Sequence, residues 1–138
     1  MIPATVPPSG GSTQRFEESD SNIIYTGTWI SGVSSSFSEG TAKLSKTPNS
    51  YFEFTFTGTG IRWITYLSSN RGQADVYIDG NLISTVDTYS ASPKAQKVAF
   101  EKLDLSSGSH TIKIVVKGTS NSASTGNYIT IDAFDVLN

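Results

Sequence analysis

Hydrophobic and polar residues alternate along several short segments of the chain, which is the pattern expected of β-strands. In the segment 51–57, Phe52, Phe54 and Phe56 alternate with polar side chains. Because successive side chains of a strand point to opposite faces of its sheet, this pattern predicts a strand with one buried face. The segment 61–67 is apolar on both faces, which predicts a central strand of a sheet.

Further strands are predicted where short apolar or alternating segments lie between turn residues. These segments are 15–17, 23–29, 41–45, 74–79, 82–87, 98–103, 110–117 and 128–136. Many short strands separated by turns indicate an all-β fold, specifically a jelly-roll β-sandwich of two antiparallel sheets. No segment has the longer periodicity of an amphipathic helix.

A stretch rich in proline, glycine and serine precedes the first predicted strand. Residues 1–14 hold three of the five prolines and show no apolar periodicity. Such a composition gives a semi-extended spacer with too little apolar surface to fold. It also lacks the basic start and apolar segment of a signal peptide. We therefore assign residues 1–14 to a flexible linker, with a cloning remnant as the alternative, and residues 15–138 to the folded domain.

The composition supports a sheet protein and excludes several classes of function. Serine and threonine, 22 and 16 of the 138 residues, suit the outer faces and loops of sheets. The net charge of −2 argues against a nucleic-acid partner, which would need a basic surface. No apolar run approaches the roughly 20 residues of a membrane span. The absence of cysteine excludes disulfides, zinc–thiolate sites and thiol catalysis.

Catalytic motifs are not found. The single histidine, His110, follows a Ser/Gly stretch and is expected to be an ordinary surface residue at a loop end. No nucleophile elbow, Walker loop or zinc-protease motif occurs. A glycosidase would need two carboxylates about 5–10 Å apart in a cleft, and a sandwich of this length has few long loops to wall one. We expect a non-enzymatic domain, with a small glycosidase or lyase as the minority alternative.

One predicted hairpin places chemically useful residues at one end of a sheet. Asp-Gly-Asn between two strand segments is a strong hairpin signal. With Gly80 and Asn81 as the turn, counting outward places Gly72 opposite Tyr89 and Arg71 beside it, opposite Ser90. Pairing of the segments 61–67 and 74–79 through the loop 68–72 would bring Tyr66 to the same end.

The side chains gathered at this end have the chemistry needed to bind a sugar. They comprise two aromatic rings, a guanidinium, an amide, a hydroxyl and a carboxylate, from Tyr66, Asn70, Arg71, Asp87, Tyr89 and Ser90. A flat ring stacks on the C–H face of a sugar, and planar donors bind pairs of hydroxyls. In the alternative interpretation, the two tyrosines pack under the loops and Arg71 forms a surface ion pair with Asp87.

The two tryptophans are interpreted mainly as core residues. Trp63 lies on the same face of its predicted strand as Ile61 and Leu67, which favours burial. Trp29 lies near a strand end and is expected to fill the core, with an exposed stacking platform as the alternative.

A carboxylate interrupts the apolar pattern of the last predicted strand. Asp132 follows Ile131 and precedes Ala133, so it must be paired, hydrogen-bonded or metal-bound. Glu17, near the N-terminal end of the domain, offers a second hard oxygen ligand of the kind that Ca²⁺ prefers. A structural calcium at Glu17 and Asp132 is one hypothesis. The other is that Asp132 accepts backbone N–H bonds or pairs with a cation.

Three segments carry a family resemblance. They are 15–29 (RFEE…IYTGTW), 58–90 (GTGIRW…ADVYIDG…TVDTYS) and 108–136 (GSHTIKIV…IDAFDV). Together they resemble the galactose-binding-like β-sandwich modules appended to bacterial glycoside hydrolases and surface proteins. Several related families hold a structural calcium between an N-terminal Glu-x-Glu and an aspartate of the last strand. Asp132 matches that aspartate and Glu17 one glutamate, although Glu17-Glu18 departs from the spacing.

The resemblance implies a function and a location. It implies a non-catalytic carbohydrate-binding module that holds a linked glycan-active enzyme on its polysaccharide, in a secreted or cell-surface bacterial protein. A structural or adhesive spacer of a surface or phage-tail protein is the alternative. No family's sugar contacts can be aligned by motif here, so the predicted binding cluster rests on the hairpin geometry.

Overall fold

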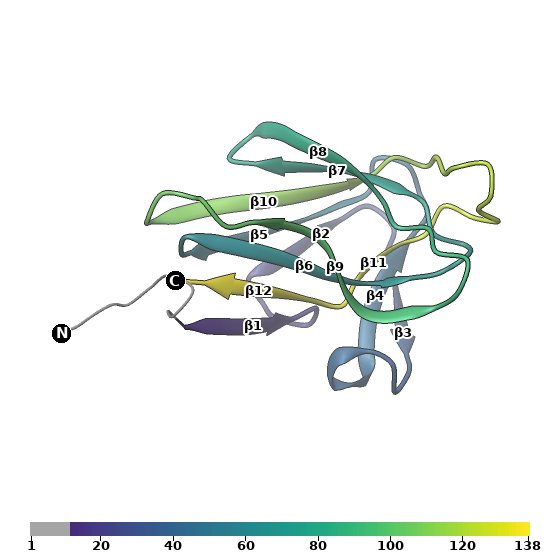
Figure 1. Cartoon of the computed structure of the whole chain (residues 1–138), viewed down its shortest axis with the longest axis horizontal. Coiled ribbons are helices and arrows are strands. Elements are labelled where there is room, and N and C mark those ends of the chain that lie inside the picture. The colour runs from purple at the N-terminus through teal and green to yellow at the C-terminus, as the bar shows by residue number, and fades with distance from the viewer. Residues whose placement is uncertain (1–11) are drawn as a thin grey trace.

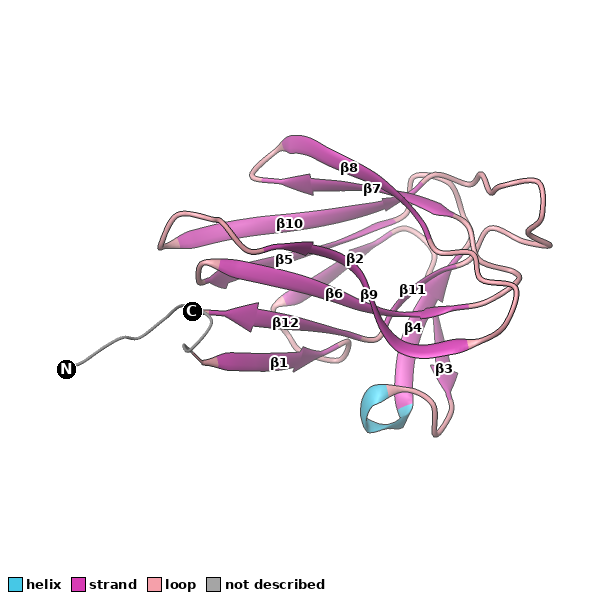
Figure 2. Cartoon of the chain, in the orientation of Figure 1, coloured by secondary structure: helices cyan, strands magenta, loops and turns pink. Residues whose placement is uncertain are grey.

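The computed structural model describes residues 12–138 as an all-β protein (Figures 1 and 2). A short 3₁₀ turn, Ser38–Gly40, precedes the fourth strand. The strands are β1 Thr13–Glu17, β2 Ile23–Thr26, β3 Ile30–Val33, β4 Thr41–Ser45, β5 Tyr51–Thr57, β6 Gly60–Leu67, β7 Gln73–Ile78, β8 Asn81–Asp87, β9 Lys94–Lys102, β10 Ser109–Val116, β11 Ile129–Ile131 and β12 Ala133–Leu137.

Two large antiparallel sheets form the body of the molecule. One has the order β2-β5-β10-β7-β8 and the other the order β1-β12-β6-β9. The predicted all-β sandwich is confirmed. The structure adds a small third sheet, β11-β4-β3, beside the large ones (Figure 1). Its strand β3 was not predicted, because Ile30–Val33 contains a glycine and has no clear alternation.

Aromatic residues fill the space between the two large sheets. Phe52, Phe54 and Phe56 point inward from β5, as their alternation predicted, and are at most 5% exposed. The ring of Phe54 stacks on that of Phe134 from the opposite sheet, with 5.0 Å between centroids. Trp63 is fully buried and donates its indole N–H to Thr130 O at 3.0 Å. Its predicted place in the core is confirmed.

Trp29 occupies the edge of this core. It is half-buried, and its ring meets that of Phe52 edge-on with 5.3 Å between centroids. The indole N–H donates to Thr26 O at 3.0 Å. The residue is therefore a partly exposed core residue rather than an open platform.

The predicted pairing of the segments 61–67 and 74–79 is wrong. Strand β6 is central, as its apolar faces indicated, but its neighbours are β12 and β9. The short loop 68–72 carries the chain from one large sheet to the other, so β6 and β7 belong to different layers. Neighbours far apart in sequence supply the pairing of β6, and no local spacing reveals them.

The predicted hairpin forms with its turn shifted by one residue, and a bulge between Val76 and Tyr77 leaves the pairing at Gly72 one residue from the predicted one. The turn is Asp79-Gly80, with φ values of 52° and 84°, and Ile78 pairs with Asn81. Two consecutive positive φ values define the tight hairpin turn that matches strand twist, and aspartate tolerates that conformation. Gly72 therefore lies opposite Thr88 rather than Tyr89, as the bond from Thr88 N–H to Gly72 O shows.

The last predicted strand is divided at Asp132. Strand β11 pairs with β4 in the small sheet, whereas β12 pairs with β1 and β6. Asp132 lies at the crossing point, where its backbone N–H donates to Ile64 O at 3.0 Å. The polar residue in the apolar run thus marks a change of sheet.

The N-terminal boundary also differs by a few residues. Thr13 and Gln14, which were assigned to the linker, already pair with Leu137 and Val136. The remainder of the predicted linker, residues 1–11, lies outside the described residues. Within residues 12–138, no helix has the length and apolar character needed to cross a membrane.

Candidate functional site

Three loops meet at the end of the sandwich opposite the C-terminus (Figure 1). They connect β6 to β7, β8 to β9 and β10 to β11, and we call them together the rim (residues 68–72, 88–93 and 117–128). Backbone N–H groups of Thr88 and Ser90 donate to Gly72 O and Ser68 O, each at 3.0 Å. Tyr128 N–H donates to Asn70 O at 3.1 Å. These bonds hold the three loops together as one surface.

Arg71 is the most deeply placed of the predicted site residues. It is 6% exposed, and its Nε donates to Tyr66 O at 3.1 Å. Nη1 donates to Asn70 Oδ1. Nη2 makes no hydrogen bond to another residue of 12–138, and it is accessible to solvent. Burial lowers the pKa of the guanidinium, which still remains charged.

The two tyrosines of the predicted cluster differ in what they can offer a ligand. The guanidinium of Arg71 lies over the ring of Tyr66, 5.2 Å from the centroid, and Phe37 meets the ring edge-on at 5.7 Å. Tyr66 is therefore engaged in packing. Tyr89 is half-buried, and its ring has no aromatic or cationic partner among the described residues. Of the two rings, that of Tyr89 is the better placed to stack on a ligand.

Asp87 does not pair with Arg71. It accepts hydrogen bonds from Tyr89 N–H at 3.0 Å and from Asn121 Nδ2 at 2.8 Å. The alternative of a surface ion pair between Arg71 and Asp87 is thus not what the structure shows. The Ser90 hydroxyl donates to Ser92 O at 2.7 Å, which shapes its own loop.

The structure places four of the six predicted residues in the rim and the other two, Tyr66 and Asp87, at the strand ends next to it, and it adds a third loop that sequence reasoning did not use. Residues 117–128 contribute Asn121 and Ser124, whose hydroxyl lies 2.7 Å from Arg71 O. Asn121 orients Asp87, and Tyr128 N–H closes on Asn70. The Gly-, Ser- and Asn-rich composition of 118–127 was the available signal, since such loops often carry binding groups.

Glu17 and Asp132 come together at the 3₁₀ turn Ser38–Gly40, where Ser38 links them. The Ser38 hydroxyl donates to Glu17 Oε2 at 2.8 Å, and Ser38 N–H lies 3.0 Å from both oxygens of Asp132. Glu18 is beside them, with Oε2 accepting from Thr41 Oγ1 at 2.8 Å. Burial raises the pKa of Glu17 and raises that of Asp132 to about 6.

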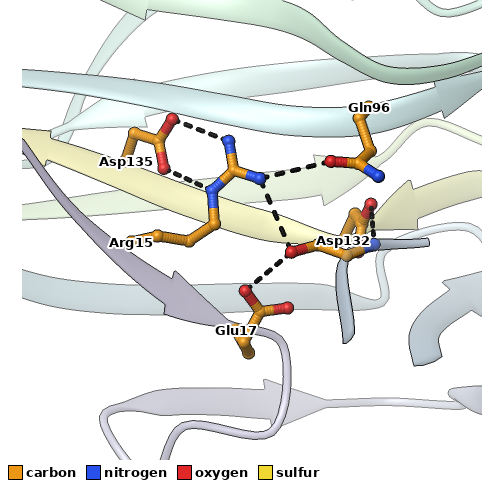
Figure 3. Close-up of polar contacts among 6 residues, drawn as sticks. Arg15, Glu17, Gln96, Asp132 and Asp135 are labelled. Carbon is orange, nitrogen blue, oxygen red and sulfur yellow. Dashed lines mark hydrogen bonds and ion pairs between the residues drawn. The ribbon is translucent and has the colours of Figure 1, made fainter. Parts of the chain in front are cut away.

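An arginine lies at the edge of this acidic cluster (Figure 3). Arg15 Nε and Nη2 donate to Asp135 at 2.7 and 2.9 Å, so its charge is mainly compensated there. Its Nη1 lies 3.4 Å from Gln96 Oε1 (Figure 3). The arginine therefore does not neutralise Glu17 directly.

The cluster meets part of what a calcium ion requires. Glu17 Oε1 and Glu18 Oε1 are buried and have no hydrogen-bond partner among the described residues. Such orphaned oxygens suit a hard cation. Across residues 12–138, however, no three acidic or histidine side chains are arranged to hold a metal ion. Only two orphaned carboxylate oxygens of the described chain are therefore available, and a cation bound here would need its remaining oxygens from backbone carbonyls, hydroxyls or water.

His110 is not the surface residue that the sequence suggested. It is 8% exposed, with Nδ1 2.6 Å from Asp79 Oδ2 and Nε2 2.7 Å from Ser106 O. Both contacts raise its pKa, because both ring nitrogens face acceptors. The histidine fastens the β7–β8 turn to the start of β10 at the end of the sandwich away from the rim (Figure 1).

Comparison with known proteins identifies the family. Residues 35–133 match the model of the carbohydrate esterase 2 N-terminal domain. The chain is 44% identical over 115 residues to "A type blood alpha-D-galactosamine galactosaminidase" of Flavonifractor plautii, covering 83% of this chain and 10% of that protein. It is 41% identical over 99 residues to "A type blood N-acetyl-alpha-D-galactosamine deacetylase" of the same organism, covering 72% of this chain and 13% of that protein.

A solved structure shows the same fold as a separate module. The CBM36-1 domain of a multidomain xylanase from the hindgut metagenome of Trinervitermes trinervoides has a TM-score of 0.58 at 16% identity. The match covers 92% of this chain and 97% of that domain. The predicted galactose-binding-like β-sandwich of carbohydrate-active proteins is thereby confirmed. The chain spans about a tenth of the length of the curated relatives, and it belongs to the carbohydrate esterase 2 N-terminal family.

Proposed function

We propose that this domain is a non-catalytic carbohydrate-binding module and that the rim is its binding surface. The observation that carries the proposal is the fixed presentation of Arg71 and Tyr89. Backbone hydrogen bonds hold their two loops together, Nη2 of Arg71 makes no hydrogen bond to another described residue, and the Tyr89 ring has no aromatic or cationic partner among the described residues. Loops ordered in this way lose little conformational entropy when a ligand binds.

The chemistry of these groups suits a sugar. A tyrosine ring stacks on the apolar C–H face of a pyranose, and a guanidinium donates to neighbouring hydroxyls. The side-chain oxygen of Asn70 accepts from Arg71, which leaves the N–H groups of the same side-chain amide free to donate to a ligand. Asp87 and Ser90 shape the loop that carries Tyr89. Such partly exposed contacts compete with water, so we expect weak affinity for a single site.

A non-catalytic role agrees with the size of the match and with the position of His110. The domain corresponds to about a tenth of the curated relatives, which leaves most of each relative for catalysis. His110 is bound between Asp79 and Ser106 and lies away from the rim. The domain would keep a linked glycan-active enzyme close to its substrate and raise the local concentration of that substrate.

The relatives suggest a first ligand and a location. Their names specify A type blood amino-sugar substrates, so glycans ending in α-linked galactosamine or its N-acetyl form are the first candidates. A module that binds such glycans would work outside the cell, in a secreted or cell-surface protein.

We also propose a structural calcium ion at Glu17 and Asp132, with Glu18 beside them. The support is the pair of buried carboxylate oxygens without partners, Glu17 Oε1 and Glu18 Oε1. The end of β1 already lies beside the junction of β11 and β12, where Glu18 N–H donates to Asp132 O at 3.1 Å. A bound ion would link these two segments further. Its role would be stability rather than ligand binding, since none of these three carboxylates belongs to the rim.

A glycan array probed with this chain tests the proposed function. We expect retention of a defined group of glycans, and loss of that retention in Tyr89→Ala. Tyr77→Ala is the matched control, because Tyr77 lies on the outer face of the five-stranded sheet, between Val76 and Ile78, which point into the core. Failure to bind any glycan would favour a structural or adhesive spacer, and turnover of a bound glycan would favour an enzyme.

A further inference from the structure

A small hollow lies beside the β11-β4-β3 sheet, and Tyr128 of the rim is part of its lining. Its volume is about 90 Å³. The side chains around it include those of Thr28, Ile30, Leu44, Lys46, Thr47 and Tyr128. Ile30 is 53% exposed, so an apolar wall of this hollow faces solvent.

The hollow is continuous with the rim through Tyr128. Ile30 of β3 pairs with Leu44 of β4, and these strands form its floor. Tyr128, which closes one side, donates its backbone N–H to Asn70 O and accepts from Gly72 N–H at 2.9 Å. Tyr128 therefore belongs both to the lining of the hollow and to the rim that carries Asn70 and Arg71.

The size of the hollow limits what can enter it. A cavity of about 150 Å³ is needed to hold benzene, so a hollow of about 90 Å³ is too small for a sugar ring. It is large enough for a methyl-bearing substituent of a sugar. The aliphatic side chains of Ile30 and Leu44, with the Tyr128 ring, would cover such a methyl group.

The edge of the hollow is polar and carries a positive charge. Lys46 Nζ lies 5.5 Å from the centroid of the Tyr128 ring, and within residues 12–138 no carboxylate is at ion-pair distance from it. Thr28 and Thr47 are exposed at the same edge and carry hydroxyl groups. Ammonium and hydroxyl donors beside a methyl-sized apolar floor match the carbonyl and methyl of an acetyl group.

We infer that this hollow is a subsite for the acetyl group of an acetylated sugar, held next to the rim. The inference rests on the proposed carbohydrate-binding function and deepens it by naming the substituent that is recognised. The acetyl methyl lies against Ile30 and Leu44, and the acetyl oxygen accepts from Lys46 or a threonine hydroxyl. A sugar with a hydroxyl in place of the acetamido group leaves Ile30 and Leu44 exposed to solvent.

Calorimetric titration of this chain with two matched glycans tests the subsite. One glycan ends in N-acetyl-α-galactosamine, and the other ends in α-galactose, which keeps the charge neutral. Burial of one methyl group corresponds to about fourfold in affinity, so we expect wild type to prefer the acetylated glycan by at least about fourfold. Thr28→Phe, which fills the hollow, is expected to abolish this preference while galactose binding remains. Thr26→Phe, outside the lining, is the matched control and should retain the preference.

The outcomes separate the subsite from the proposed function. Equal affinity of wild type for the two glycans would overturn the subsite and leave the carbohydrate-binding function standing. Persistence of the preference in a folded Thr28→Phe protein would also overturn it. Binding of neither glycan by wild type would overturn the subsite, and a glycan array would then decide the wider function.

Discussion

The guanidinium of Arg71 lies over the ring of Tyr66 while its Nε donates to the carbonyl oxygen of the same residue. One arginine thus secures the last residues of β6 to the loop 68–72, and through Gly72 to the loop that carries Tyr89. One nitrogen of the same side chain, Nη2, makes no hydrogen bond to any other residue of 12–138. Arg71 is therefore an internal support of the rim, and in the proposed function its Nη2 is also the group that donates to the ligand.

We expect Arg71→Lys to weaken both stability and glycan binding. Lysine lacks the planar fork, so the half-buried contacts to Tyr66 O and Asn70 would not both be made. A buried acceptor left unpaired costs about 1–3 kcal/mol, and urea unfolding measures that loss. Arg62→Lys is the control, because the Arg62–Glu101 pair is partly exposed and should contribute little. Equal stability of Arg71→Lys and wild type would contradict the supporting role.

Tyr89→Ala is expected to separate binding from stability. Loss of a stacking ring should reduce glycan affinity about tenfold, which corresponds to ~1.4 kcal/mol. The melting temperature should change little, because no aromatic partner packs on this ring among the described residues. Affinity electrophoresis and a thermal melt on the same samples measure the two effects. A large fall in the melting temperature with unchanged glycan retardation would show that Tyr89 is a packing residue.

The His110–Asp79 pair should make stability depend on pH. The pKa of His110 is raised by its bonds to Asp79 and Ser106 O, so its stabilisation is complete below its ordinary pKa of about 6.5 and is lost as pH rises through the raised value. The pKa of Asp79 is lowered, chiefly by His110, so its contribution persists above about pH 4 and is lost at lower pH.

The predicted consequence is a stability difference that is largest in mildly acidic solution. The free energy of unfolding of wild type should exceed that of His110→Gln most between about pH 5 and 6, and the gap should narrow by about pH 9. Asp104→Asn, which removes an exposed partner of Lys102, is the control and should give a flat difference over this range. If the difference in unfolding free energy between wild type and His110→Gln is constant or grows toward pH 9, the charged pair is ruled out.

Calcium removal tests the acidic cluster. If an ion binds only the folded domain, saturation at about 100 times its dissociation constant adds about 2.7 kcal/mol of stability. We expect excess EDTA to lower the melting temperature of wild type by several degrees and that of Glu17→Gln much less. Glu39→Gln, an exposed glutamate nearby, should behave as wild type. Identical melts of wild type in calcium and in EDTA would remove the ion from the account.

The fold could be predicted where local pattern decides it. The alternation around Phe54 and the Asp-Gly-Asn turn are determined by side-chain period and by φ preferences, and both elements form. The position of the turn was missed by one residue, because aspartate and asparagine both tolerate positive φ. The partners of β6 were missed because they come from β9 and β12, which are distant in sequence.

The sequence could predict which residues lie together at the candidate site, but it could not predict how deeply they are buried. The hairpin brings Arg71 and Tyr89 to the same end even with its shifted register, because one residue of slip is small compared with the width of the loops. The loop 117–128 contacts Arg71, with the Ser124 hydroxyl donating to Arg71 O at 2.7 Å. No periodicity in the sequence of that loop indicates where it packs.

The most direct test of the account is an NMR titration of the isotopically labelled chain with a glycan retained on the array. Binding at the rim predicts that the largest backbone amide shift changes fall in residues 68–72 and 88–93, with Tyr89 among them and the β7–β8 turn at Asp79 unchanged. The largest changes on the outer face of the five-stranded sheet, or no changes at saturating glycan, would contradict it.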